Sequence, residues 1–357
     1  HQHGASWGTP LDAQHLTLAE RLAERGYATG GFVANLVFAS SRSGLAQGFS
    51  TYEDIPTRPT LGHFLHSFRI VETATRALVH RMDGPDPALI KQTAEDINRD
   101  FLAWLDRTDR LPFFAFLNYM DVHSPFGLHS PFDTLFGDRP RYNRIGQEGW
   151  NDATGHYDEE QRLSLLAAYD ASWAYLDHQI GRLFDQLEAR GILDETVVVI
   201  VGDHGEAFGE HGLRFHSAVP YDEVLKVPAV IFAPGRIAPG SRATGLRQQT
   251  DLLPTVAEVM GARVEGGRLP GVSLLSEVPD SRTLYHAGWI ENQSMAVRRG
   301  SRKFVYHFGR RPIEVFDTER DPLETSPEEL ESQSAAARDV AADLHLWRAR
   351  VNAAYAP

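Results

Sequence analysis

Cysteine is absent from this 357-residue chain, which excludes a disulfide framework and any metal site built from thiolates. An excess of positive charge is absent as well, because 35 Lys and Arg stand against 48 Asp and Glu and no basic block occurs. The formal net charge of −13 therefore disfavours binding to nucleic acid or to an anionic membrane surface. Long apolar runs are also lacking, and none approaches the roughly 20 residues of a membrane-spanning helix.

Helix and strand signals alternate along the first two thirds of the chain. Residues 17–25 place Leu18 and Leu22 on one face and stop at Gly26, which is typical of an amphipathic helix, and residues 27–34 follow as a strand. This alternation predicts an α/β fold with a mostly parallel, doubly wound sheet flanked by helices. We expect further helices over residues 61–82, 87–107, 158–190 and 251–260, and further strands over residues 112–119, 196–201 and 227–232.

The pattern changes from about Gly261 to short strands separated by turn residues. Such a succession predicts an antiparallel sheet. The expected strands cover residues 283–287, 295–299, 303–308 and 313–316, and a helix over residues 334–354 closes the chain. We therefore divide the chain into an α/β core, residues 1–262, and a small C-terminal α+β subdomain, residues 263–357.

The run from Thr196 to Val201 ends in the tetrapeptide Asp203-His204-Gly205-Glu206. A β-branched run without polar alternation predicts a strand that is buried on both faces. Ligands of open α/β sheets bind at the C-terminal ends of strands, and a carboxylate and an imidazole are both good ligands for a divalent metal. Asp203 and His204 are therefore candidate metal ligands. The alternative is an Asp that caps the following turn beside a surface His.

Three further histidines follow strand ends. His123 comes after the strand at 112–119, and an imidazole there could hold an anionic oxygen or protonate a leaving group. Taken alone, a turn His packed under Pro125 is the better interpretation of His123. His211 and His216 lie in the loop after His204 and could line the same pocket, although His211 is the one that we expect to be structural.

These motifs, in this order, resemble the sulfatase family of the alkaline phosphatase superfamily over nearly the whole chain. Asp203-His204-Gly205-Glu206 with Gly209-Glu210-His211-Gly212 resembles the metal motif of the family, and Asn118 to Pro125 resembles its substrate-histidine loop. Other similar segments cover residues 175–196, 221–228, 250–255 and 314–324. The resemblance is colinear, which makes it specific although each piece alone is not decisive.

The resemblance implies metal-dependent hydrolysis of a small-molecule or glycan sulfate ester. Asp203 and His204 would supply half of the coordination shell of a divalent metal, with calcium first and manganese or zinc as alternatives. His123 and His216 would be catalytic and substrate-binding, and Arg214 would bind substrate as well. The family commonly has a Lys where this loop offers Arg214 and His216. That departure leaves open a phosphodiesterase, a phosphonate monoester hydrolase or a phosphoethanolamine transferase.

One part of the family's pattern has no counterpart in this chain. In the family, paired Asp ligands and the nucleophile precede a Gly-x-x-Pro-x-x-His-Gly segment, and His1-Gln2-His3-Gly4 resembles the end of that segment. The resemblance thus implies that the chain begins just after the nucleophile, and we expect the 357 residues to be inactive alone. A third interpretation is a degenerate domain without catalysis. The sequence indicates neither the compartment nor the natural substrate, and we expect substrate choice to depend on the irregular segment 126–155.

Overall fold

The computed structural model describes residues 10–35, 38–54, 92–108, 111–143, 157–216, 219–261, 271–287, 294–308, 311–331 and 334–354. The chain forms two compact units, residues 1–145 with 158–186 and 351–357, and residues 146–157 with 187–350. The helix predicted over 61–82, the proposed domain boundary at 262 and the end of the irregular segment 126–155 lie outside the described residues. They stay predictions.

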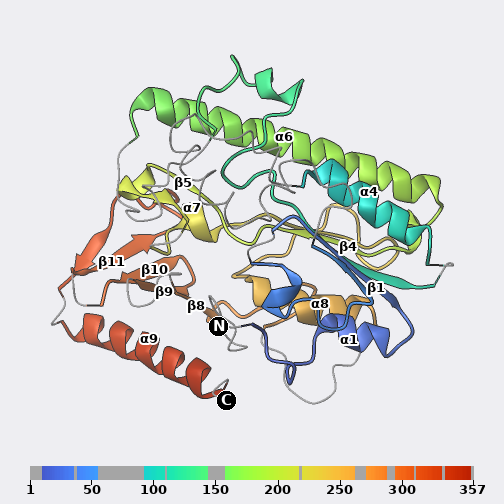
Figure 1. The fold of residues 1–357 in the computed structure, drawn as a ribbon. Helices are drawn as coiled ribbons and strands as arrows, with labels where there is room; N and C mark the ends of the chain where they lie inside the picture. The colour runs from blue at the N-terminus through green and yellow to red at the C-terminus, as the bar shows by residue number, and fades with distance from the viewer. Residues whose placement is uncertain are drawn as a thin grey trace. The chain divides into compact units, whose positions relative to one another are not determined.

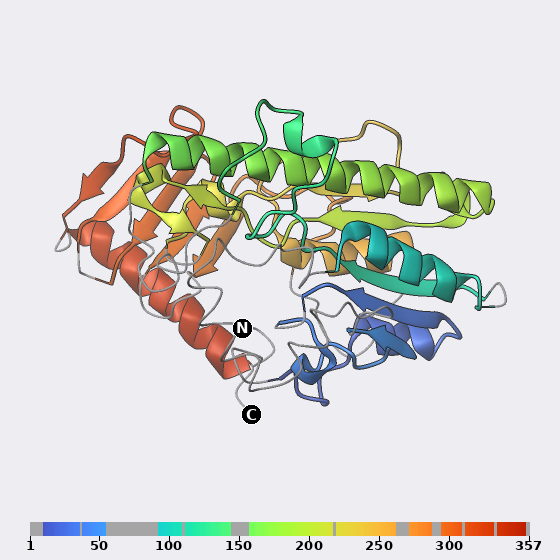
Figure 2. The ribbon, with the colours of Figure 1, turned by 45° about the horizontal axis from the view of Figure 1, so that its top comes forward.

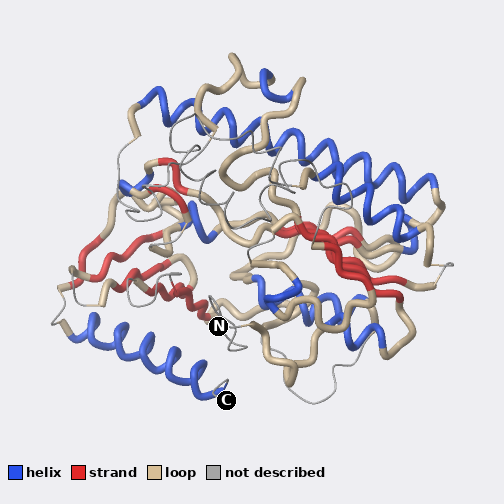
Figure 3. Tube along the Cα trace, viewed as in Figure 1, coloured by secondary structure: helices blue, strands red, loops and turns tan. Residues whose placement is uncertain are grey.

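The first unit contains a parallel sheet. Its strands are β2 (Thr51–Glu53), β1 (Ala28–Val33) and β3 (Phe113–Asn118), in that order across the sheet, and Figure 3 shows them in red. A Cβ at Gly30 would lie 2.9 Å from the Trp104 ring, so glycine lets helix α4 (Ala94–Leu105) pack closely on β1. The predicted strands over 27–34 and 112–119 are confirmed, as is the parallel sheet.

The helices of the first unit begin where the sequence offers capping residues. Thr17 caps α1 (Leu18–Ala23) and Thr93 caps α4 (Ala94–Leu105), each in a capping box. The long helix α6 (Glu159–Ala189) lies beside α4 (Figure 2), where Asn98 Nδ2 donates to the carbonyl oxygen of Gln179 at 2.9 Å. Short 3₁₀ turns cover Ser41–Ser43 (η1) and Phe132–Thr134 (η3). The last residues of α6, from Leu187 onward, belong to the second unit.

The strand that carries the Asp-His pair is β4 (Val198–Val201) in the second unit. It pairs antiparallel with β7 (Ala229–Phe232). The expectation that these strands are buried was wrong, because Val201 is 40% exposed and Val230 is 56% exposed. Among the described residues β4 has one hydrogen-bonded neighbour, and a two-stranded ribbon does not cover its own faces. A 3₁₀ turn, η4 (Leu193–Glu195), precedes β4.

The predicted antiparallel C-terminal sheet is confirmed, and it belongs to the second unit. Its order is β12 (Glu328–Leu330), β11 (Ile313–Asp317), β10 (Arg302–Tyr306), β9 (Met295–Arg299) and β8 (Thr283–Ala287). One face packs against α9 (Ala335–Ala354), which runs along the sheet in Figure 1. The core between them is apolar and contains Met295, Val297, Ile313, Val315, Ala337, Val340 and Leu344.

The other face of this sheet supports the loops that follow β4. Ala296, Val305 and Phe316 point to this face because side chains alternate along a strand. They pack with Leu213 and Tyr221 of the segment that contains the hairpin of β5 (Ala207–Phe208) and β6 (Arg214–Phe215) and the short helix α7 (Asp222–Leu225). A 3₁₀ turn η6 (Gln249–Asp251) leads into α8 (Leu252–Val259), as predicted. Among the helices that the structure describes, none combines the length and apolar character needed to cross a bilayer.

Candidate active site

Asp203 and His204 lie directly after β4 and face each other. His204 Nδ1 lies 2.9 Å from the carbonyl oxygen of Gly205, which can only accept, so Nδ1 carries the ring proton. Nε2 is then the acceptor nitrogen, and it lies 3.7 Å from Asp203 Oδ2. The Asp203 side chain is 85% exposed and that of His204 is 33% exposed. The pair therefore presents a carboxylate oxygen and an imidazole lone pair side by side and accessible.

Contacts with Gln249 and with helix α7 fix the turn that carries Asp203 and His204. Gln249 Nε2 donates to the carbonyl oxygens of Gly202 and Asp203, both at 2.7 Å. The Gly205 N–H donates to the carbonyl oxygen of Val224 at 2.8 Å. A Cβ at Gly205 would lie 2.0 Å from the carbonyl oxygen of Glu223, so only glycine allows α7 to approach this closely.

His216 stacks on His204. The two ring centroids lie 3.8 Å apart with 20° between the ring planes, and the Phe215 ring stacks on His216 at the same distance. Phe215 has φ +73°, an uncommon conformation for a non-glycine residue, which orients the chain into this arrangement. The Glu206 carboxylate lies 3.2 Å from His216 Nδ1. Glu206 thus holds His216 from behind while His204 covers its face.

Burial decides the protonation of Glu206 and His216. Burial raises the pKa of Glu206 to about 8, only partly offset by His204. Burial, together with the neighbouring His204, lowers the pKa of His216 to about 3. Both shifts favour the neutral forms near neutral pH. A neutral Glu206 donates its proton to Nδ1 of His216, and the imidazole then keeps an N–H at Nε2 that can donate to an anion.

Arg214 stacks on an aromatic ring. Its guanidinium carbon lies 4.3 Å from the centroid of Tyr157, within the range of a cation–π contact. Burial raises the pKa of Tyr157 to about 12 although Arg214 opposes the shift. The stacking fixes the plane of the guanidinium group on the segment next to His216.

His123 lies in the turn after β3, as predicted, and belongs to the first unit. Its Nδ1 donates to the carbonyl oxygen of Ser124 at 2.7 Å, which leaves Nε2 as the acceptor. The neighbouring Asp121 is buried, and its carboxylate accepts the Ala94 N–H at the start of α4 at 3.2 Å. The structure brings Asp203, His204 and His216 together in the second unit, and Arg214 belongs to the same unit with its guanidinium over Tyr157. The approach of His123 to them stays a prediction.

The donor set at β4 matches part of a divalent coordination shell. One carboxylate oxygen and one imidazole nitrogen are suitable ligands for such a cation. Across the described ranges, no group of three or more His, Asp or Glu side chains lies in a metal-holding arrangement. Asp203 and His204 thus fit the role in chemistry and geometry, and further ligands are needed to complete a shell.

Two polar residues of this region received no role from the sequence. Glu206 was visible in the tetrapeptide, but its contact with His216 spans ten residues and has no local signal. Lys303 did carry a signal, because it shares a strand face with Val305 in an alternating pattern, and a Lys on the inward face requires a buried partner. His211, which we expected to be structural, contacts Glu223 and Glu324 rather than His204 or His216.

A family model described as Sulfatase matches residues 1–262 of the chain. Among curated proteins, the choline-sulfatase of Rhizobium meliloti (strain 1021) is 37% identical over 174 residues, which are 46% of this chain and 33% of the relative. The chain therefore spans about a third of the length of this relative. Both findings agree with the motifs described above.

Solved structures share the fold over nearly the whole chain. A phosphonate monoester hydrolase of Agrobacterium radiobacter superposes with a TM-score of 0.67 and 21% identity, covering 100% of this chain and 83% of that chain. A protein solved in complex with its substrate D-glucosamine-2-N,6-O-disulfate superposes with a TM-score of 0.64 and 17% identity, covering 99% and 85% of the two chains. At these identities the likeness concerns the fold alone.

Proposed function

Because the chain belongs to the sulfatase family, we propose that it takes part in the metal-dependent hydrolysis of sulfate esters. The observation that carries the proposal is the pair of Asp203 and His204 after β4, with the acceptor nitrogen of His204 facing the exposed carboxylate at 3.7 Å. An exposed carboxylate beside an oriented imidazole lone pair is suited to binding a divalent cation.

Asp203 and His204 would hold the cation. A divalent cation at this place would neutralise the charge of the ester oxygens and lower the pKa of a nucleophile. Calcium is the first candidate on the account of the family, and the imidazole favours manganese or zinc as alternatives. The additional ligands and the nucleophile that the reaction needs are not among the side chains assigned above.

His216 would act on the anionic ester. With its Nδ1 facing Glu206, the Nε2–H can donate a hydrogen bond to an equatorial oxygen of the sulfate, or it can pass to the leaving oxygen while the neutral Glu206 transfers its own proton to Nδ1. Arg214 would add a positive charge in an orientation that Tyr157 fixes. We assign the same chemistry to His123 in its doubly protonated form, in which Nδ1–H is held by the carbonyl oxygen of Ser124 and Nε2 carries the proton that is donated.

We propose that the substrate is a sulfate ester of a small molecule or a glycan. The choline-sulfatase and the protein bound to a disulfated glucosamine are named for sulfated ligands of these two kinds, and they support this choice by similarity only. A second candidate is hydrolysis or transfer of a phosphate or phosphonate ester. It is favoured by His216 standing where the family commonly has a Lys, since an imidazole does not select sulfate over a phosphoryl group.

The test compares a sulfate and a phosphonate ester of the same phenol with the protein in its natural form. Release of the phenol is followed for an aryl sulfate and for the matching aryl phosphonate, with and without a chelator of divalent cations. We expect faster turnover of the sulfate, lost on chelation and restored by added cation. Faster turnover of the phosphonate would favour the second candidate, and turnover of both esters unchanged by the chelator would reject metal-dependent hydrolysis.

A further inference from the structure

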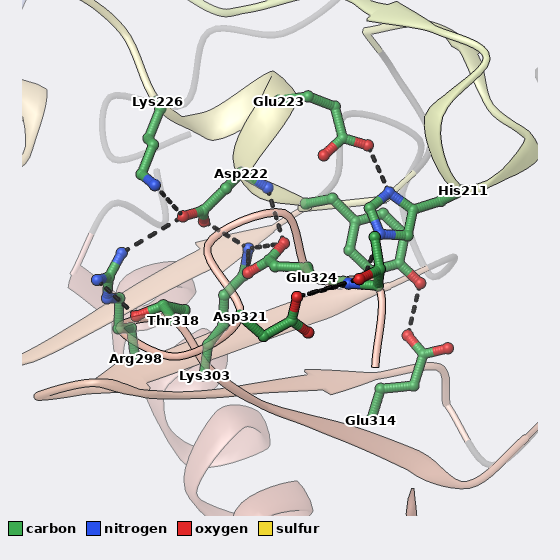
Figure 4. Close-up of polar contacts among 12 residues, drawn as sticks. His211, Asp222, Glu223, Lys226, Arg298, Lys303, Glu314, Thr318, Asp321 and Glu324 are labelled. Carbon is green, nitrogen blue, oxygen red and sulfur yellow. Dashed lines mark hydrogen bonds and ion pairs between the residues drawn. The ribbon is translucent and has the colours of Figure 1, made fainter. Parts of the chain in front are cut away.

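His211 donates hydrogen bonds from both ring nitrogens. Nδ1 lies 2.7 Å from the Glu223 carboxylate and Nε2 lies 2.7 Å from the carbonyl oxygen of Glu324 (Figure 4). A backbone carbonyl can only accept, and an ionised carboxylate can only accept as well. A neutral imidazole has one N–H, so two acceptors at this distance require the doubly protonated ring. With Glu223 ionised, His211 is thus an imidazolium cation in this arrangement.

The groups around the ring favour its positive charge. The acidic side chains that face it are Glu223 from α7 and Asp321 and Glu324 from the loop after β11, and the Tyr221 ring stacks on it at 3.8 Å. Burial alone would lower the pKa of His211, but the contacts with Glu223 and Glu324 outweigh burial and raise the pKa above its ordinary value. The charge of the ring is therefore matched by its surroundings.

Glu324 is itself fixed by a buried ion cluster. Lys303 is 0% exposed, and its Nζ lies 2.7 Å from both Asp222 Oδ1 and Glu324 Oε1. The Asp222 N–H donates to Glu324 Oε2 at 2.9 Å, and Figure 4 shows the three side chains converging between α7 and β10. Glu324 has φ +55°, so its carbonyl is presented by a backbone that the cluster must hold in an uncommon conformation.

The loop that bears His211 connects the two strands of the β5–β6 hairpin. Gly209 has φ +110°, His211 has φ +53° and Gly212 has φ +68°, so three positions of this short loop need left-handed backbone. For His211 that conformation is unfavourable and persists only where the surroundings determine it. The loop lies between Glu206, just before β5, and His216, just after β6.

We propose that His211 is a positioning residue, which as an imidazolium joins Glu223 of α7 to the carbonyl of Glu324 and fixes the β5–β6 hairpin that orients His216. The inference rests on the proposed function only for the role of His216. The joint, by which we mean the contacts of His211 with Glu223 and with the carbonyl oxygen of Glu324, lies within the second unit. Because its charge can be removed by raising the pH, the joint also makes the order of the hairpin dependent on pH.

The test observes the ring and the hairpin directly, without turnover. Nitrogen-15 NMR of labelled histidine follows the protonation of His211 against pH, and amide hydrogen exchange of residues 207–216 follows the hairpin. We expect His211 to be doubly protonated at neutral pH and to titrate above the ordinary range of a histidine. Protection of the hairpin amides, taken relative to their intrinsic exchange rates at each pH, should fall at least about tenfold in the His211→Gln variant and, for the parent, as the pH passes through the raised pKa.

Matched variants separate the joint from a general loss of folding. Glu223→Gln keeps the size of the acceptor but removes its charge, so we expect a lower pKa of His211 and faster exchange of the hairpin, while Glu329→Gln of β12 and His345→Gln leave both unchanged. A neutral His211 at neutral pH, or hairpin exchange that is the same in Glu223→Gln and Glu329→Gln, would overturn the proposal. Sulfate turnover plays no part in either outcome, so the proposed function can fail independently.

Discussion

Glu206 hydrogen-bonds to His216 in the interior of the second unit, and a buried carboxyl group beside an imidazole decides which ring nitrogen carries the proton. The raised pKa of Glu206 and the lowered pKa of His216 both favour a neutral pair in which Nδ1 accepts. The orientation of the single N–H of His216 thus depends on Glu206.

Substitution of Glu206 tests this dependence. Glu206→Ala should lower kcat/KM for an aryl sulfate by roughly 10–100-fold, the usual cost of losing a partner behind a functional histidine. Glu206→Gln should retain most activity, because its amide N–H can donate to Nδ1 as the neutral carboxyl group does. The exposed Glu195→Ala in η4 serves as control. Full activity of Glu206→Ala would show that His216 needs no partner.

At the scale of secondary structure, η6 and α8 are tied to the C-terminal part of the second unit by one buried ion pair. Asp251 is completely buried and receives Arg282 in a bidentate contact, with N–O distances of 2.6 and 2.8 Å. The N–H groups of Gln248 and Val272 donate to the same carboxylate. This pair holds the segment from which Gln249 reaches the turn of Asp203.

Removal of the Arg282 side chain should be costly. Arg282→Ala leaves the carboxylate of Asp251 buried without its cation, and we expect the free energy of unfolding to fall by about 3–5 kcal/mol in urea titrations. Arg302→Ala breaks the exposed ion pair with Glu328 in the same unit and should cost about 0–1 kcal/mol. Equal effects of the two substitutions would contradict the importance assigned to burial.

Local patterns predicted most of these elements. The leucine spacing of the first helix and the short C-terminal strands between turn residues give signals within a few positions, and the structure confirms these elements. The burial of β4 was mispredicted because burial depends on which strands lie beside a run, and the run itself does not encode them. Strand β12 was missed because Glu328 and Glu329 are poor strand formers.

In the candidate site, too, residues with a local sequence signal could be predicted and contacts between distant segments could not. Asp203 and His204 could be found because a strand end and two ligand types are adjacent in sequence. Lys303 and Glu324 could not be paired from the sequence, because twenty-one positions separate them and only the folded sheet brings them together. Contacts between distant segments therefore account for most of what the sequence left undetermined.

At the scale of the whole molecule, acidic groups outnumber basic ones, and several of the carboxylates are stabilised in the ionised form. Burial would raise the pKa of Asp251, Asp222 and Glu314, but Arg282, Lys303 and His307 respectively outweigh it and hold each pKa below its ordinary value. A carboxyl group of this kind contributes stability above its unfolded pKa, about 4, and loses the contribution as the pH falls through its folded pKa.

Acid should therefore destabilise the protein through these carboxylates. We expect the urea midpoint to fall as the pH is lowered below about 4, where the unfolded chain takes up protons more readily than these native groups. Asp251→Asn should be less stable at neutral pH and should lose less of its remaining stability on acidification than the parent. The exposed Asp280→Asn is the control. An identical slope in Asp251→Asn and the parent would remove Asp251 from the acid response.

The central claim is that Asp203 and His204 hold a divalent cation, and metal analysis of the purified natural form tests it most directly. The account predicts bound divalent metal in the parent and in the exposed control Asp194→Ala, and its loss from both Asp203→Ala and His204→Ala, because each variant removes one of two adjacent ligands. Metal content that stays equal to that of the parent in both variants would contradict the account.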